Sequence, residues 1–116
     1  MNILSELTTI FTALDIPVET GVFSDTAPDE YAVITPLTDS FELFCDDGPE
    51  YETQEARISI YSKCNYLKLK GRIVRALLAA GLVITNRQYI ERENDSGYFH
   101  YEIDVITINT IEMELT

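Results

Sequence analysis

The sequence predicts an α+β fold in which a single antiparallel or mixed β-sheet carries two α-helices on one face. Two segments, residues 2–14 and 65–81, repeat apolar residues with the period of a helix. Five other segments are rich in β-branched and aromatic residues, and short turns between them favour antiparallel pairing. The order of one helix, three strands, one helix and two strands is typical of an α+β domain.

The first predicted helix spans residues 2–14 and ends before Pro17, because proline cannot continue a helix. Its apolar face repeats at helical spacing and consists of Leu4, Leu7, Phe11 and Leu14. No regular pattern follows in residues 18–30, which are therefore expected to form a connection.

Five strands are predicted from β-rich runs and alternating apolar and polar residues. They are residues 31–37, 41–45, 57–61, 83–93 and 98–110. Residues 51–56 would extend the third strand toward its N-terminus. The Asn-Asp-Ser-Gly sequence at residues 94–97 predicts a turn between the last two strands.

The second helix, residues 65–81, has the clearest sequence signature. One half of its helical wheel is predicted to form core: Tyr66, Leu67, Leu69, Ile73, Val74, Leu77, Leu78 and Ala80. The opposite side carries a basic face made of Lys68, Arg72 and Arg75. Gly81 is predicted to cap the C-terminus, with Leu82 as the apolar residue that accompanies such a cap.

Length and composition indicate an ordinary globular protein. The chain has 116 residues, of which 46% are hydrophobic and 24% charged, so a single domain over residues 1–116 is expected. No run of about 18 apolar residues is present, and the N-terminus lacks the basic residues of a secretory signal. Cys45 and Cys64 have neither CxxC spacing nor histidines nearby, and they are predicted to be reduced.

Charge is divided into three blocks along the chain. Residues 1–56 contain acids and no Lys or Arg, and residues 57–90 contain bases and no Asp or Glu. Residues 91–116 are acidic again apart from Arg92, and the net charge is −12. Such a chain would repel nucleic-acid phosphates over most of its surface. The same division lets the acidic part of one copy meet the basic part of another.

The segment CDDGPEYETQEA, residues 45–56, is the most acidic part of the chain. We expect it to be a loop between two strands that contacts a partner or faces a passage. The carboxylates concerned are Asp46, Asp47, Glu50, Glu52 and Glu55. The alternating oxygen ligands and the glycine of a calcium-binding loop are missing, so at most weak cation binding is expected.

No catalytic, cofactor-binding or metal-binding site is predicted, and the protein is not expected to be an enzyme or to need a cofactor. His100, Glu102 and Asp104 fall on one face of the last strand, but their alternation is that of a solvated strand face. Phosphate-binding glycine motifs and a nucleophile elbow are absent from the sequence.

Three segments together resemble the tail-completion or tail-terminator proteins of long-tailed bacteriophages and prophages, also called tail-to-head joining proteins. The segments are PVETGVFSDTAPDEYAVI (17–34), ARISIYSKCNYLKLKGRIVRALLAAGLVI (56–84) and FHYEIDVI (99–106). The likeness lies in the order of elements: an amphipathic helix, the entry into the first strand, a strand leading into a helix that ends in Ala-Gly, and a long aromatic strand.

This resemblance implies a structural protein that forms a hexameric ring at the head-proximal end of the tail tube. Its partners would be other copies of itself, the tail tube protein and the head connector protein, while DNA passes through without specific binding. The protein would be found in the bacterial host cytoplasm during assembly and then in a virion or tail-like particle. A contractile and a flexible tail, and a phage and a tail-like bacteriocin, remain open alternatives.

A small acidic inhibitor or DNA mimic encoded by a phage or mobile element is the alternative function. The net charge suits such a protein. The basic block at residues 57–90 counts against it, because a mimic of DNA should be acidic over its whole binding face.

Overall fold

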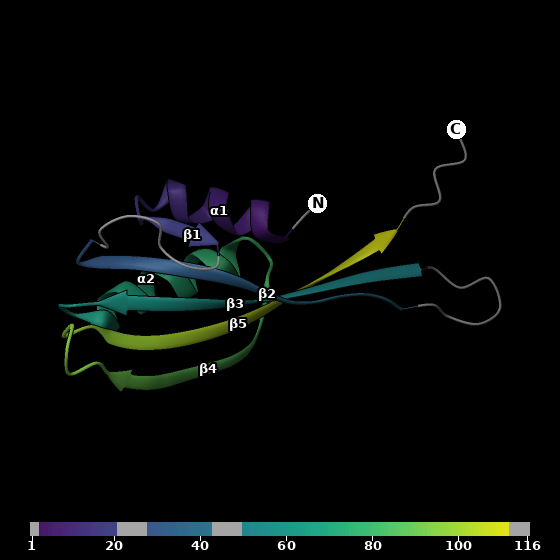
Figure 1. Ribbon diagram of the computed structural model, residues 1–116. Coiled ribbons are helices and arrows are strands. Elements are labelled where there is room, and N and C mark those ends of the chain that lie inside the picture. Colours follow the sequence, from purple (N-terminus) through teal and green to yellow (C-terminus); the bar gives the residue numbers. More distant parts are fainter. Residues whose placement is uncertain (1–2, 21–27, 43–49, 112–116) are drawn as a thin grey trace.

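The computed structural model describes residues 3–20, 28–42 and 50–111 and confirms the predicted α+β fold (Figure 1). One mixed sheet of five strands, in the order β1-β2-β3-β5-β4, packs against two helices. The elements are α1 (Ile3–Ala13), β1 (Val18–Thr20), β2 (Glu30–Glu42), β3 (Glu50–Ser62), α2 (Tyr66–Ala79), β4 (Val83–Arg92) and β5 (Phe99–Ile111).

The core lies between the helices and one face of the sheet. Leu7 and Phe11 from α1 and Ile73 and Leu77 from α2 are fully buried against β2, β3 and β5. The residues that the three strands contribute to this core are Ala32, Ile34, Ala56, Ile58, Ile60, Tyr101, Ile103 and Val105. The two helices therefore stabilise the fold by covering the same sheet face.

Two sequence predictions about strands were wrong. Residues 18–30 were expected to form only a connection, but Val18–Thr20 is a short edge strand parallel to β2. Residues 31–37 and 41–45 were expected to be separate strands, but β2 is continuous from residue 30 to 42. A register shift between Pro36 and Thr38 lets β2 accommodate the proline, because a bulge leaves one residue outside the ladder.

The ends of α2 follow the predicted chemistry. Asn65 Oδ1 accepts hydrogen bonds from the backbone N–H groups of Leu67 at 3.1 Å and Lys68 at 3.3 Å. Gly81 has a φ of 83°, and the Leu82 N–H donates to the Leu77 carbonyl at 3.1 Å. The predicted glycine cap is therefore confirmed, and Leu82 is buried in the core as its apolar partner.

Helix α1 ends in the same motif with an unusual residue. The Ile16 N–H donates to the Phe11 carbonyl at 3.0 Å, and the Asp15 N–H donates to the Thr12 carbonyl at 3.1 Å. Asp15 therefore occupies the left-handed position, with a φ of 60°, where glycine is usual. The carboxylate also stands at the negative end of the helix dipole, which is unfavourable for an anion.

Strands β2, β3 and β5 continue beyond the helices and form an arm (Figure 1). The arm consists of residues 38–42, 50–53 and 108–111, which remain paired across all three strands. Gln54 Oε1 accepts a hydrogen bond from the Ile3 N–H at 2.8 Å, so the first turn of α1 marks the point where helix cover ends. Neither described helix has the length and hydrophobicity that a membrane span requires.

Candidate functional site

The predicted acidic residues are divided between the arm and the body of the sheet. Asp46 and Asp47 lie outside the described residues. Glu50 and Glu52 belong to the part of β3 that forms the arm, and Glu55 is half-buried on β3 opposite Ile106 of β5. The expectation of a loop over residues 45–56 is therefore wrong from Glu50 onward, because this part of the chain pairs with strands on both sides. The expected extension of the third strand over residues 51–56 is confirmed.

The predicted basic face of α2 is present but not uniform. Lys68 and Arg75 are exposed, whereas the Arg72 guanidinium donates to the Leu14 carbonyl at 2.7 Å. Arg72 therefore satisfies a carbonyl at the C-terminal end of α1 and links the two helices. Lys70, on the apolar half of the wheel, places its ammonium 5.0 Å from the centre of the Tyr101 ring.

Most of the positive charge is not neutralised within the described part of the chain. Arg57 is the only basic residue that forms an ion pair with a described carboxylate. The exposed bases Lys68, Arg75 and Arg87 are therefore available to an external acidic partner.

Arg57 of β3 and Asp104 of β5 form a bidentate pair on the sheet face opposite the helices. Arg57 Nε donates to Asp104 Oδ1 at 2.9 Å, and Nη2 donates to Oδ2 at 3.2 Å. The side chain of Asp104 is only 10% exposed, so the solvated strand face expected for this residue is wrong. Strands β3 and β4 flank Asp104 on either side of β5. The pKa of the Arg57 guanidinium is raised by these hydrogen bonds and by the charge of Asp104.

An aromatic ladder crosses the same face of the sheet. Tyr31, Tyr61 and His100 are direct partners on β2, β3 and β5. The Tyr31 and Tyr61 ring centroids are 4.8 Å apart, and those of Tyr61 and His100 are 4.4 Å apart, both stacked. Tyr98 meets both tyrosines edge-on and donates to the Pro28 carbonyl at 2.6 Å. This ladder ties three strands together.

His100 is mostly covered by its neighbours. Its Nε2 is buried without a hydrogen-bond partner among the described residues and lies 3.6 Å from Glu102 Oε2. Its ring contributes to the stack with Tyr61.

Alkaline pH should destabilise the protein through the ladder. Burial, followed by the charges of Tyr61, Tyr98 and Glu93, raises the pKa of Tyr31 from 10.0 to about 12. The unfolded chain therefore releases this proton first, so the contribution of Tyr31 is complete below pH 10.0 and is lost as the pH rises through about 12. Denaturant unfolding at a series of alkaline pH values should show a shallower decline for Tyr31→Phe than for the wild type. Equal declines in the two proteins would contradict this assignment.

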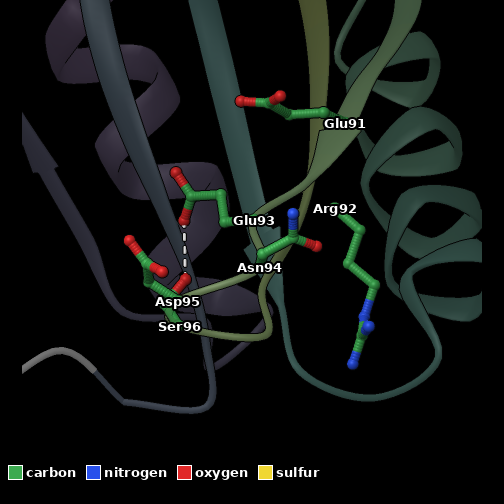
Figure 2. Close-up of a pocket in the computed structure, with 6 residues that line it drawn as sticks. All are labelled: Glu91, Arg92, Glu93, Asn94, Asp95 and Ser96. Carbon is green, nitrogen blue, oxygen red and sulfur yellow. Dashed lines mark hydrogen bonds between the residues drawn. The ribbon is translucent and has the colours of Figure 1, made fainter.

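The hollow at the turn between β4 and β5 is lined by four charged residues together with Asn94 and Ser96 (Figure 2). Glu93 accepts a hydrogen bond from the Ser96 hydroxyl at 2.8 Å, which fixes the turn. Arg92 points away from Glu93 and Asp95 and lies 5.6 Å from the centre of the Phe99 ring. Among the described residues, no three metal-ligating side chains gather here or elsewhere.

The sequence also left undetected an exposed apolar surface. Leu67, Leu78 and Ala80 were expected in the core, but Leu67 and Leu78 are 56% and 57% exposed and Ala80 is exposed as well. Helix α2 buries only the stripe Leu69, Ile73 and Leu77, because the sheet is in contact with one narrow side of the helix. The apolar half of the helical wheel is wider than the stripe that the helix buries, and this difference was the sequence signal for a contact surface.

Comparison with known proteins gives a structural likeness. No protein family profile and no curated protein sequence matches the chain. A chain from the virion of a native gene transfer agent particle has a similar structure, with a TM-score of 0.52 and 12% sequence identity. The match covers 89% of this chain and 84% of that chain, so the shared fold includes nearly all of both.

Proposed function

We propose that the protein is a structural component of a phage-like particle that forms a ring at the head-proximal end of the tail tube. The ring ends tube polymerisation and joins the tail to the head connector. The observation that carries this proposal is the fold shared with a chain of the gene transfer agent virion over 89% of this chain. A place at the head-proximal end of the tail is supported by the resemblance to tail terminators, which lies in residues 17–34, 56–84 and 99–106.

The distribution of charge supports an assembly role. A ring requires two different surfaces on each copy, and the chain has an acidic block at residues 1–56 and a basic block at 57–90. We propose that six copies form the ring and that its partners are the tail tube protein and the head connector protein. No catalytic role is proposed, since the sequence carries no motif for one.

The acidic residues of the arm and its connection suit a surface along which DNA passes. Carboxylates at Asp46, Asp47, Glu50 and Glu52 would repel phosphates and prevent the DNA from adhering to the ring. Glu55 adds a further carboxylate to β3 at the base of the arm.

Deleting the gene from a particle-producing host should leave heads and tails unjoined, with tails of irregular length. Electron microscopy of the particles measures both features, and expression of the intact chain from a second copy should restore them. Normal, joined particles from the deletion strain would contradict the proposal. An inhibitor would instead leave particle structure unchanged and would remain a monomer or dimer at every concentration.

A further inference from the structure

An apolar surface lies along the side of α2 that faces away from α1. Leu67, Val74 and Leu78 recur at the spacing of one helix side, and the ring of Tyr89 on β4 lies 5.6 Å from that of Tyr66 at the start of α2. Leu67, Leu78 and Tyr89 are 56%, 57% and 45% exposed. These four residues are the α2–β4 patch. Isolated exposed leucines are ordinary, but apolar residues that recur along one exposed side of a helix indicate a contact surface.

Three exposed bases lie on the same two elements as the α2–β4 patch. Lys68 and Arg75 are exposed on α2, and Arg87 is exposed on β4. None of them pairs with a described carboxylate, and residues 57–90 contain no acid that could do so locally. A partner that fits this surface has an apolar centre and negative charge beside it.

The opposite edge of the same molecule offers that combination. A hollow between α1 and β1, the α1–β1 hollow, is lined by Thr8, Thr12, Asp15, Ile16, Pro17 and Val18. The hydroxyls of Thr8 and Thr12 already donate to carbonyls of Leu4 and Thr8 at 2.8 Å, so the hollow has few unmet polar groups. Asp15 supplies its negative charge, and the guanidinium of Arg72 binds the carbonyl of the adjacent Leu14 without forming an ion pair with Asp15.

The position of Asp15 supports a role outside its own subunit. The C-terminal end of α1 disfavours a carboxylate, whereas the left-handed φ of 60° is one that aspartate adopts more readily than most residues. Among the described residues, Asp15 forms no ion pair. A residue type that lowers the stability of its own subunit is typical of a functional position.

We propose that the α2–β4 patch of one copy docks into the α1–β1 hollow of the next copy. Strand β1 and strand β4 are the two edges of the sheet, so the two surfaces face in opposite directions. Such a contact is head-to-tail, and repeating it produces a closed ring when the rotation between copies closes. The ring rests on the proposed function, but the contact can be tested without the particle.

Cysteine trapping tests the contact directly. Cys45 and Cys64 are first replaced by serine, and Leu78→Cys and Thr12→Cys are then introduced together in one chain. Oxidation should give a ladder of covalent multimers, because each copy carries both halves of the contact. A mixture of Leu78→Cys chains with Thr12→Cys chains should stop at the heterodimer. Dimers from Leu78→Cys alone, or no trapping at any concentration, would overturn the proposal.

Charge and apolar variants give a second measurement, the association constant from sedimentation. Leu78→Glu should weaken association by about tenfold or more, since it removes a buried leucine from the contact. Leu37→Glu is the matched control, because Leu37 is an exposed apolar residue of β2 outside both surfaces, and it should have no effect. Asp15→Arg should also weaken association, and combining it with Arg75→Glu and Arg87→Glu should restore it. Equal losses from Leu37→Glu and Leu78→Glu, or no rescue, would contradict the assignment.

The results separate this inference from the proposed function. A covalent ladder together with normal particles from the deletion strain would retain the contact and reject the tail role. Unjoined particles without a ladder would retain the tail role and reject this contact surface.

Discussion

Truncating Leu77 to alanine should lower the free energy of unfolding by about 2–5 kcal/mol, whereas the same change at Leu78 should cost under about 0.5 kcal/mol. Leu77 is fully buried between α2 and the sheet, and its removal would leave a cavity. Leu78 is 57% exposed, so little apolar contact is lost within the subunit. Ile73, also fully buried, should behave like Leu77.

The two leucines form a matched pair for this experiment. They are adjacent in one helix, and the substitution changes helix propensity by the same small amount at both positions. Denaturant unfolding measures both variants, at a protein concentration low enough to keep the subunit monomeric. Equal losses at Leu77 and Leu78 would mean that the buried face of α2 is assigned incorrectly.

Replacing Arg57 by methionine should lower the free energy of unfolding by about 1.5–3 kcal/mol. The change removes two charge-assisted hydrogen bonds and leaves the carboxylate of Asp104, whose side chain is 10% exposed, without its counter-charge. The figure lies below that of a fully buried pair because the side chain of Arg57 is 39% exposed to solvent.

A double-mutant cycle isolates this interaction. Asp104→Asn combined with Arg57→Met should cost less than the sum of the two single changes, since the second change has no pair left to break. Glu102→Gln is the control, because Glu102 Oε1 lies 3.5 Å from Arg57 Nε, at the limit of a hydrogen bond. Additive losses at Arg57 and Asp104 would show that the pair contributes little.

Local chemistry was sufficient to predict most elements of the fold. Asn65 and Gly81 delimit α2 through backbone hydrogen bonds made within a few residues, so the sequence carries their signal. Periodicity likewise located β3, β4 and β5. Strand β1 has only three residues, too few for alternation to be recognised, and it is held by pairing with β2. Pro36 appeared to end a strand because only the pairing with β3 reveals the bulge that accommodates it.

The contact surfaces were less predictable than the elements. The sequence placed Lys68, Arg72 and Arg75 on one helix side, but the position of α1 decides that Arg72 binds the Leu14 carbonyl. The acidic segment was recognised from its composition. Which residues of the acidic segment belong to β3 depends on how far β2 and β5 continue to pair with β3.

The sequence by itself determined the helices, most of the strands and the separation of acidic from basic residues, because these depend on the order of side chains along the chain. Only the tertiary structure decided that Leu77 is core while Leu78 is surface, and that Asp104 is buried against Arg57. The physical reason is that periodicity defines a face of a helix or strand but not how much of that face its neighbours cover. The burial of a face depends on the packing of elements distant in sequence. In this protein that packing leaves the apolar residues Leu67 and Leu78 of α2 exposed.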